Sequence, residues 1–142
     1  MTMLITGANG FVGRRVCRVA IDVGLRARDA VRRSDKSFER LKRVVISALD
    51  DATDWRHALA DCQAVVHTAA RVNVMTELAD NPLDEFRRSR VNVERTLHLI
   101  HEAAASDVRR FVFASSVKVN GEATTADRPF TTAGTPAPQD PY

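Results

Sequence analysis

The chain has 142 residues, of which 44% are hydrophobic and 27% charged, and its formal net charge is +3. This is the length of one domain and the composition of an ordinary soluble protein with a buried core. Its arginines are scattered rather than grouped with aromatic residues, which argues against nucleic-acid binding. No apolar run approaches the roughly 20 residues that span a membrane, and the N-terminal run is too short for a signal peptide. Two cysteines, Cys17 and Cys62, indicate no disulfide framework, so we expect a cytoplasmic protein.

The first fourteen residues predict a buried strand, a glycine-rich turn and the start of a helix. The strand is the short apolar run at residues 3–5, and a helical pattern opens near Phe11. Glycines lie between them at Gly7, Gly10 and Gly13. In a dinucleotide site, the first glycine makes the turn, the second lets the main chain approach a pyrophosphate, and the third packs the helix against its strand. The helix N-terminus then offers free N–H groups to the phosphates. The alternative is a tight turn with incidental glycines.

The rest of the chain alternates between strand and helix patterns. Strands are predicted at residues 3–5, 25–31, 43–48, 64–67 and 111–114, and helices at residues 11–23, 55–59 and 83–105. We expect Gly24 to end the first helix and Asp51 or Thr53 to cap the second. Residues 120–142 hold four of the five prolines and are predicted to be loop. The order predicts a Rossmann-type, doubly wound parallel sheet of about five strands between two helix layers, a three-layer α/β/α fold.

Ligands of such sheets bind beyond the carboxyl ends of the strands. Small, polar or basic residues occupy these ends, namely Thr6-Gly7, Arg32-Arg33, Ala48-Leu49, Thr68-Ala69-Ala70 and Ser115-Ser116. The sequence therefore predicts that a ligand site lies along this edge.

With these landmarks, the chain resembles the extended short-chain dehydrogenases/reductases. More narrowly, it resembles the NAD-dependent epimerase/dehydratase family, which acts on nucleotide-activated sugars. The residues that carry the resemblance are Thr6-Gly7-Ala8-Asn9-Gly10-Phe11-Val12-Gly13, His67-Thr68-Ala69-Ala70, Val91-Asn92-Val93, Ser115-Ser116 and Asp140-Pro141-Tyr142. The run from Val117 to Glu122 resembles a subgroup of 4-epimerases and 4-keto-reductases of UDP-N-acetyl sugars.

The resemblance implies roles for individual residues. Cofactor contacts are implied for Gly7, Asn9, Gly10, Phe11, Val12, Gly13, Arg32, Arg33, Leu49, Ala69, Ala70, Asn92 and Ser115. The implied reaction transfers hydride at a sugar carbon, with Tyr142 as the base and Ser116 as the hydroxyl that holds the substrate oxygen. Ser115 is the alternative for the serine role. No metal site is expected, and the implied substrate is a nucleotide sugar, most simply a UDP-linked one.

The cofactor could be NADP or NAD. NAD enzymes usually carry an acidic residue at the end of the second strand, where it binds the ribose 2′-hydroxyl. Here Val31 holds that place, Arg32 and Arg33 follow it, and Asp29 comes two residues too early. Because an arginine pairs well with a 2′-phosphate, the sequence favours NADP. The alternative is two solvated arginines in an NAD protein. Ala48 also stands where the family has an aspartate that binds the adenine amino group.

The sequence ends at Tyr142, before the lysine that follows this tyrosine in the family. We therefore expect residues 1–142 to be an incomplete dinucleotide-binding domain without the C-terminal substrate domain. Such a chain should bind the cofactor but should not convert a substrate. The resemblance implies a homodimer for the full-length enzyme, with the helix at residues 83–105 in its interface. Two alternatives remain, a non-catalytic NADP-sensing module and a steroid- or flavonoid-type reductase of the same superfamily.

Overall fold

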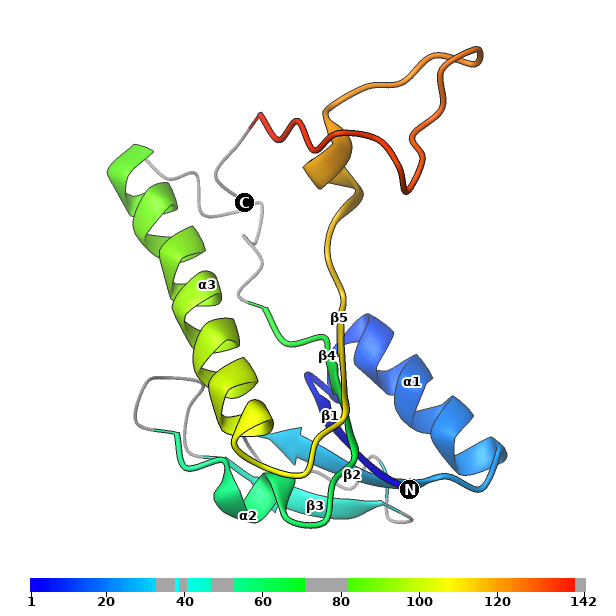
Figure 1. Ribbon diagram of the computed structural model, residues 1–142, viewed down its shortest axis with the longest axis vertical. Helices are drawn as coiled ribbons and strands as arrows, with labels where there is room; N and C mark the ends of the chain where they lie inside the picture. The colour runs from blue at the N-terminus through cyan, green and yellow to red at the C-terminus, as the bar shows by residue number, and fades with distance from the viewer. Residues whose placement is uncertain (33–37, 39–40, 47–52, 71–81, 140–142) are drawn as a thin grey trace.

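The computed structural model describes residues 1–32, 38, 41–46, 53–70 and 82–139, with backbone alone at 82–91. The elements, shown in Figure 1, are β1 (Thr2–Thr6), α1 (Phe11–Asp22), β2 (Arg26–Val31), β3 (Lys42–Val45), α2 (Arg56–Leu59), β4 (Ala64–His67), α3 (Pro82–Ala104), β5 (Arg110–Phe113) and the 3₁₀ helix η1 (Val117–Asn120). Every predicted strand and helix is present, so the alternation of patterns is confirmed. Among the described residues, no helix is both long and apolar enough to cross a membrane.

The five strands form one parallel sheet in the order β3-β2-β1-β4-β5. The chain builds outward from β1 to β3, then crosses back and continues from β4 to β5. Helix α1 lies on one face of the sheet, and α2 and α3 lie on the other (Figure 1). This arrangement is the predicted three-layer Rossmann-type fold. The strand order reverses between β1 and β4, and ligands bind at such a point in doubly wound sheets.

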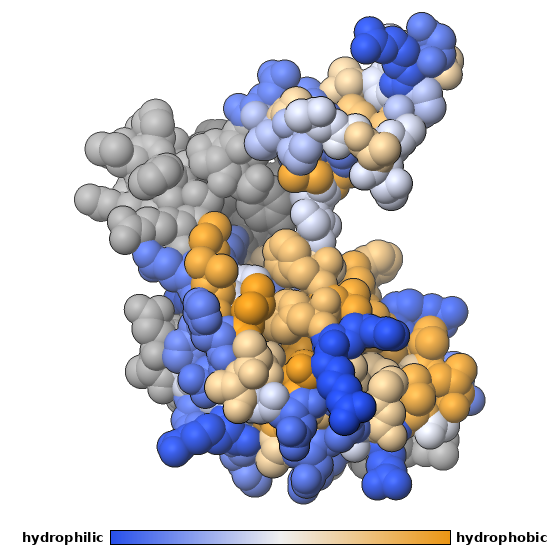
Figure 2. Space-filling view, in the orientation of Figure 1, coloured by the Kyte–Doolittle hydropathy of each residue, from blue (hydrophilic) through white to orange (hydrophobic). Residues whose placement is uncertain are grey.

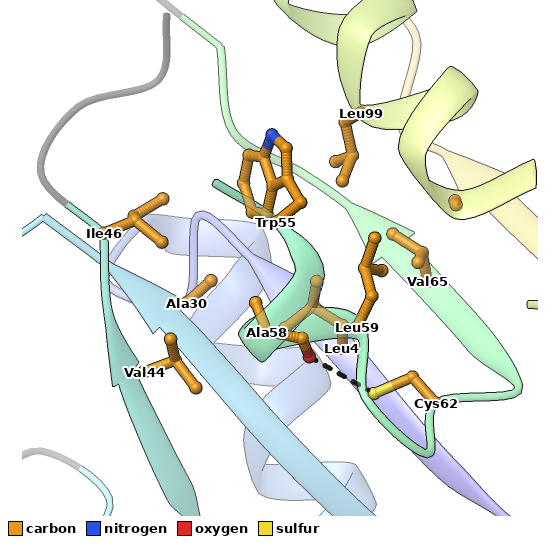
Figure 3. Packing of buried hydrophobic residues seen from close by; sticks show 11 residues of the cluster. Leu4, Ala30, Val44, Ile46, Trp55, Ala58, Leu59, Cys62, Val65 and Leu99 are labelled. Carbon is orange, nitrogen blue, oxygen red and sulfur yellow. Dashed lines mark hydrogen bonds between the residues drawn. The ribbon is translucent and has the colours of Figure 1, made fainter. Parts of the chain in front are cut away.

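Two hydrophobic clusters hold the helices to the sheet, because successive strand residues point to opposite faces. On β1, Leu4 joins the cluster under α2 and α3, and Ile5 joins the cluster under α1. Figure 3 shows the first cluster, in which Trp55 and Leu99 bring the start of α2 and the C-terminal part of α3 over the sheet. Both side chains are fully buried, and truncating a residue such as Leu99 to alanine costs about 2–5 kcal/mol.

The two cysteines lie in different clusters. Cys17 packs with the α1 cluster and Cys62 with the α2–α3 cluster, so the sheet separates the two thiols. Burial raises the pKa of the Cys17 thiol to about 11. Both residues therefore serve as small buried apolar side chains.

Helix α1 ends as its glycine predicts. Gly24 has a φ of +70°, a conformation that favours glycine. Its N–H donates to the carbonyl of Ile21 at 3.1 Å, and the N–H of Leu25 donates to the carbonyl of Ala20 at 2.9 Å. These two bonds make a Schellman motif, which satisfies carbonyls that the helix leaves open.

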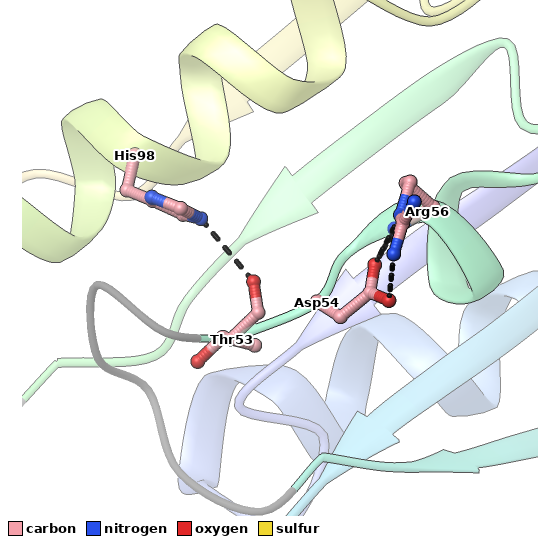
Figure 4. A network of polar contacts seen from close by, with 4 residues as sticks. All are labelled: Thr53, Asp54, Arg56 and His98. Carbon is pink, nitrogen blue, oxygen red and sulfur yellow. Dashed lines mark hydrogen bonds and ion pairs between the residues drawn. The ribbon is translucent and has the colours of Figure 1, made fainter.

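The predicted cap of α2 is wrong for Thr53, and Asp51 lies outside the described residues. Thr53 is buried, and its carbonyl oxygen accepts a hydrogen bond from Nε2 of His98 at 3.2 Å (Figure 4). The N-cap residue is Trp55, which makes no side-chain capping bond, and the carboxylate of Asp54 just before it accepts from the backbone N–H of Arg56 at 3.0 Å. The same carboxylate pairs with the Arg56 guanidinium, and these hydrogen bonds lower the pKa of Asp54 to about 2.

Strand β2 is polar because two of its charged residues have buried partners. Arg28 Nη1 donates to the carbonyl oxygens of His57 at 3.0 Å, Ala58 at 2.6 Å and Ala60 at 3.0 Å, all at the end of α2. On the other face, Oδ2 of Asp29 accepts from Nε and Nη2 of Arg43. The ion pair joins neighbours in the register of β2 and β3. These contacts tie β2 to α2 and to β3.

Candidate functional site

The carboxyl ends of β1 and β4 meet at the point where the strand order reverses. The turn after β1 begins at Gly7, whose φ is +69°. A Cβ atom on Gly7 would lie 2.7 Å from the backbone nitrogen of Ala69 and 2.8 Å from the carbonyl carbon of Thr68. The two loops are therefore packed too closely for any side chain at this position. The glycine is needed for both its conformation and its size.

Gly10 and Gly13 meet different constraints. A Cβ on Gly13 would lie 2.1 Å from the carbonyl oxygen of Gly7, so only glycine lets α1 pack onto the turn. A Cβ on Gly10 would meet only that same oxygen, at 3.2 Å. Gly10 has extended backbone angles that other residues adopt readily, and it stands at the N-cap of α1. The fold therefore requires glycine at position 13 far more strictly than at position 10.

The N-terminus of α1 has the features of an anion site. Gly10 supplies no side-chain cap, and the first turn contains no acidic residue. A helix N-terminus of this kind presents unpaired N–H groups and a positive dipole end, both of which favour a phosphate. We call the space in front of Gly10 and the first turn of α1 the cradle. A Cβ on Gly10 would fill this space, which is of the kind that takes a pyrophosphate, and these residues therefore fit a dinucleotide.

The remaining residues of the predicted cofactor loop line the rim of this cradle. Phe11 is 95% exposed and Val12 is 52% exposed, which leaves an apolar surface at the start of α1. Asn9 is exposed as well, and its carbonyl oxygen accepts from Nε of Arg14 at 3.0 Å. From the β4 side, Ala69 is half-buried and Ala70 is exposed. The structure thus gathers these predicted residues around one turn.

Beneath the cradle lies a polar cluster that the sequence pattern did not reveal. Thr6 Oγ1 lies 2.7 Å from Nδ1 of His67, and Nε2 of His67 lies 3.2 Å from Oγ1 of Thr96 on α3. The hydroxyl of Thr68 donates to the carbonyl oxygen of Thr6 at 2.7 Å. The sequence signal that could have indicated this cluster is the presence of polar residues at the buried ends of two neighbouring strands. A histidine at the end of a buried strand is expected to be packed, and the 2% exposure of His67 confirms this.

For recognition of the ribose, the structure distinguishes Asp29 from the arginine that follows β2. Asp29 is fully buried and bound to Arg43, so it is not at the ligand edge. Arg32 follows the buried Val31 at the end of β2 and is exposed. Arg33 and Leu49 lie outside the described residues. Among the residues that can be placed, Arg32 is the charged group at the position where dinucleotide enzymes read the ribose.

The predicted catalytic pair is only half described. Ser115 is exposed in the segment after β5, and Ser116 is half-buried, where its Oγ accepts from the backbone N–H of Lys118 at 3.3 Å. Tyr142 lies outside the described residues, so its pairing with Ser116 stays a prediction. Asn92 lies half-buried on α3, one turn before Thr96. Within the described part of the chain, no three metal-ligating side chains come together as a candidate metal site.

Comparison with known proteins agrees with this geometry. A family model described as "NAD dependent epimerase/dehydratase family" matches residues 3–142. A UDP-glucose 4-epimerase of Vibrio cholerae is 35% identical over 142 residues, which cover 99% of this chain and 42% of that protein. A 3-beta-hydroxysteroid dehydrogenase of Mycolicibacterium neoaurum is 30% identical over 119 residues, 82% of this chain and 32% of that protein.

Among solved structures, a short-chain dehydrogenase/reductase superfamily protein from Agrobacterium tumefaciens with bound NAD is 34% identical, with a TM-score of 0.79. The match covers 100% of this chain and 40% of that one. The chain thus spans less than half the length of each of these relatives. A family model over nearly the whole chain, the switch-point glycine turn and the five-stranded parallel sheet lead to one conclusion: the chain belongs to the NAD-dependent epimerase/dehydratase family.

Proposed function

We propose that residues 1–142 are the dinucleotide-binding part of an NAD(P)-dependent epimerase, dehydratase or keto-reductase of nucleotide sugars. The observation that carries this is the difference between the glycines. Gly7 and Gly13 are required by the packing of β1, β4 and α1, whereas Gly10 leaves open the space in front of the α1 N-terminus. Gly10 is the one of these three glycines that packing restricts least, since its Cβ would meet a single atom at 3.2 Å, and the space in front of it suits a ligand. The similarity to a UDP-glucose 4-epimerase supports the sugar-nucleotide class.

The residues divide into cofactor and substrate groups. Backbone N–H groups at residues 11–13 would hold the pyrophosphate, and Phe11, Val12, Ala69 and Ala70 would flank it. The bound nicotinamide supplies the chemistry of accepting and returning a hydride. Ser116 would hold the substrate oxygen and Tyr142 would take its proton, since a carbinol that loses hydride must also lose its hydroxyl proton. Residues beyond Tyr142 would complete this half of the site in a longer protein.

NADP is the preferred cofactor in this proposal. Burial of Asp29 against Arg43 and exposure of Arg32 favour a 2′-phosphate over a free 2′-hydroxyl. Replacing both arginines, Arg32→Ala with Arg33→Ala, should weaken NADPH binding by about tenfold or more, because charge-assisted bonds contribute roughly 1.5–3 kcal/mol. NADH binding should change much less. Equal losses for the two nucleotides in fluorescence titrations would overturn the 2′-phosphate assignment.

The test of dinucleotide binding is Gly10→Ala. A Cβ at this position would meet the carbonyl oxygen of Gly7 at 3.2 Å, a tight contact that a shift of a few tenths of an ångström relieves, and it enters the space of the pyrophosphate. We therefore expect at least about tenfold weaker NAD(P)H binding with the free energy of unfolding changed by less than about 1 kcal/mol. Gly24→Ala is the matched control. Its φ of +70° makes alanine cost about 1–2 kcal/mol, but nothing lies within 4 Å of the new Cβ, so binding should stay intact. A folded Gly10→Ala chain that binds as the original does would exclude this site.

The similarity to a 3-beta-hydroxysteroid dehydrogenase makes a steroid reductase the second candidate. A protein that contains residues 1–142 together with a substrate domain would separate the two candidates when it is assayed with UDP-glucose, UDP-N-acetylglucosamine and a 3β-hydroxysteroid. Turnover of a UDP-sugar that Tyr142→Phe abolishes supports our proposal. Turnover of the steroid alone favours the second candidate. Dinucleotide binding without turnover of either class identifies a non-catalytic sensing module.

A further inference from the structure

His67 bridges three elements from the floor of the candidate site. The ring is 2% exposed and lies at the carboxyl end of β4, with the rings of Phe111 and Phe113 about 6 Å away. Its Nδ1 contacts the hydroxyl of Thr6 at 2.7 Å, and its Nε2 contacts the hydroxyl of Thr96 at 3.2 Å. A neutral imidazole has one donor and one acceptor nitrogen, and both hydroxyls can rotate to match it. The ring is therefore bonded at both ends, to β1 and to α3.

Thr6 is the residue through which this bridge reaches the glycine turn. It is the last residue of β1, it is fully buried, and Gly7 follows it directly. A hydrogen bond of 2.7 Å holds the threonine side chain in one rotamer, and the allowed rotamers depend on the backbone angles of the same residue. The contact with His67 thus restrains the last residue before the turn.

Thr68 holds the same turn from the other side. Its hydroxyl and its backbone N–H both donate to the carbonyl oxygen of Thr6, at 2.7 and 3.3 Å. The same hydroxyl lies 2.8 Å from the Cβ position of Gly7 and 2.9 Å from that of Gly13. The threonine hydroxyl therefore occupies the space that two of the three glycines leave, and it forms the floor of the cradle.

We propose that Thr6, His67, Thr68 and Thr96 form a positioning network that holds the glycine turn in its binding conformation and connects it to α3. The network rests on the proposed function, because the affinity that it sets is that of the turn for a dinucleotide. None of its four side chains is assigned a contact with the ligand. Its far end lies on α3 at Thr96, one turn after Asn92. Cofactor affinity should then depend on a hydroxyl that belongs to another element than the turn.

Thr96 gives the sharpest test because it is the member farthest from the turn. Thr96→Val keeps the side-chain volume and the β-branched shape but leaves Nε2 of His67 without a partner. The ring then loses the hydrogen bond that holds it in place under Thr6, and NAD(P)H binding should weaken roughly fivefold to tenfold, about the effect of one hydrogen bond. Thr96→Ser restores the hydroxyl and should restore the affinity. Ser106→Ala is the matched control, because it removes a hydroxyl just after α3 that bonds the Glu102 carbonyl and makes no bond to His67.

The possible outcomes distinguish the positioning network from the proposed function on which it rests. If Thr96→Val binds dinucleotide as tightly as the original chain, and only its melting temperature changes, the network is structural and the positioning proposal is wrong. Weaker binding in Thr96→Val that Thr96→Ser does not reverse also rules the proposal out, because the hydroxyl is then not the cause. If the original chain binds neither NADH nor NADPH, the proposed function itself fails and this inference falls with it.

Discussion

Folding changes the pH at which the imidazole of His67 takes up a proton. Burial lowers the pKa of its imidazole to about 4, from about 6.5 in an exposed histidine. The unfolded chain therefore binds a proton at this ring below about pH 6.5, whereas the folded protein resists it until about pH 4. Because the unfolded state takes up more protons over this range, the free energy of unfolding must fall as the pH falls.

We expect His67→Gln to remove this part of the acid sensitivity. A pKa difference of this size corresponds to about 3 kcal/mol between pH 7 and pH 4, which the original chain loses and the variant does not. Urea unfolding at several pH values in this range measures it. His101→Gln makes the same exchange at an exposed position of α3 and is the control for the substitution itself. The same slope in His67→Gln and the original chain would contradict the neutral, buried state of the ring.

Residues differed in how well the sequence predicted them. The turn at Gly7 and the close packing at Gly13 were predicted because a glycine pattern reports local backbone geometry, which neighbours in the chain determine, whereas the pyrophosphate contact of Gly10 stays a prediction. The partners of Asp29 and His67 were not predicted, because they come from residues 14 and 61 positions away that only the strand register brings together. Tyr142 and Ser116 were named through the resemblance alone, and their pairing is still a prediction.

At the scale of elements, β2 supports a helix too short to be stable by itself. Helix α2 has four residues, and an isolated turn of that length does not form in water. Arg28 of β2 donates to three carbonyl oxygens at its C-terminal end, where a cation also meets the negative end of the helix dipole. Two charged residues of β2, Arg28 and Asp29, therefore join the strand to α2 and to β3.

Replacing Arg28 should therefore destabilise the whole domain. We expect Arg28→Met to lower the free energy of unfolding by about 2–4 kcal/mol, because it leaves buried carbonyl groups without donors. Arg26→Met is the matched control, since Arg26 is exposed on the same strand, and it should change stability by less than about 0.5 kcal/mol. Urea unfolding of the two variants measures both effects. Comparable losses would mean that the contact with α2 carries no special stabilisation.

Helix ends that local contacts determine were also predicted, and those that distant contacts determine were missed. Gly24 was expected to end α1 and does so, because the motif is completed by residues within one turn of it. The start of α2 was missed because Asp54 and Thr53 are both good capping residues by type, although the N-cap residue is Trp55. What decides between them is the burial of Thr53 beside His98 of α3, a contact between distant parts of the chain.

For the whole molecule, the long helix has one face for the core and another for solvent. Leu99 and Ala103 are buried against the sheet, whereas Val93 is 56% and Leu97 is 48% exposed. The two exposed residues are four positions apart and so share a face of the helix. Figure 2 shows apolar surface over α3 and over the neighbouring strands. The resemblance implied that this helix lies in a dimer interface, and we propose that a second copy covers this face.

The expected behaviour is concentration-dependent self-association, because paired helices would bury these apolar side chains. Val93→Lys combined with Leu97→Lys should shift the chain to monomer in light scattering and sedimentation. The double variant should keep NAD(P)H binding, since neither residue is assigned to the cofactor site. Val23→Lys, on an equally exposed valine at the end of α1, is the control and should leave association unchanged. A stable monomer at every concentration of the original chain would exclude α3 as a pairing surface, and the exposed valine and leucine would then be ordinary solvent-facing residues.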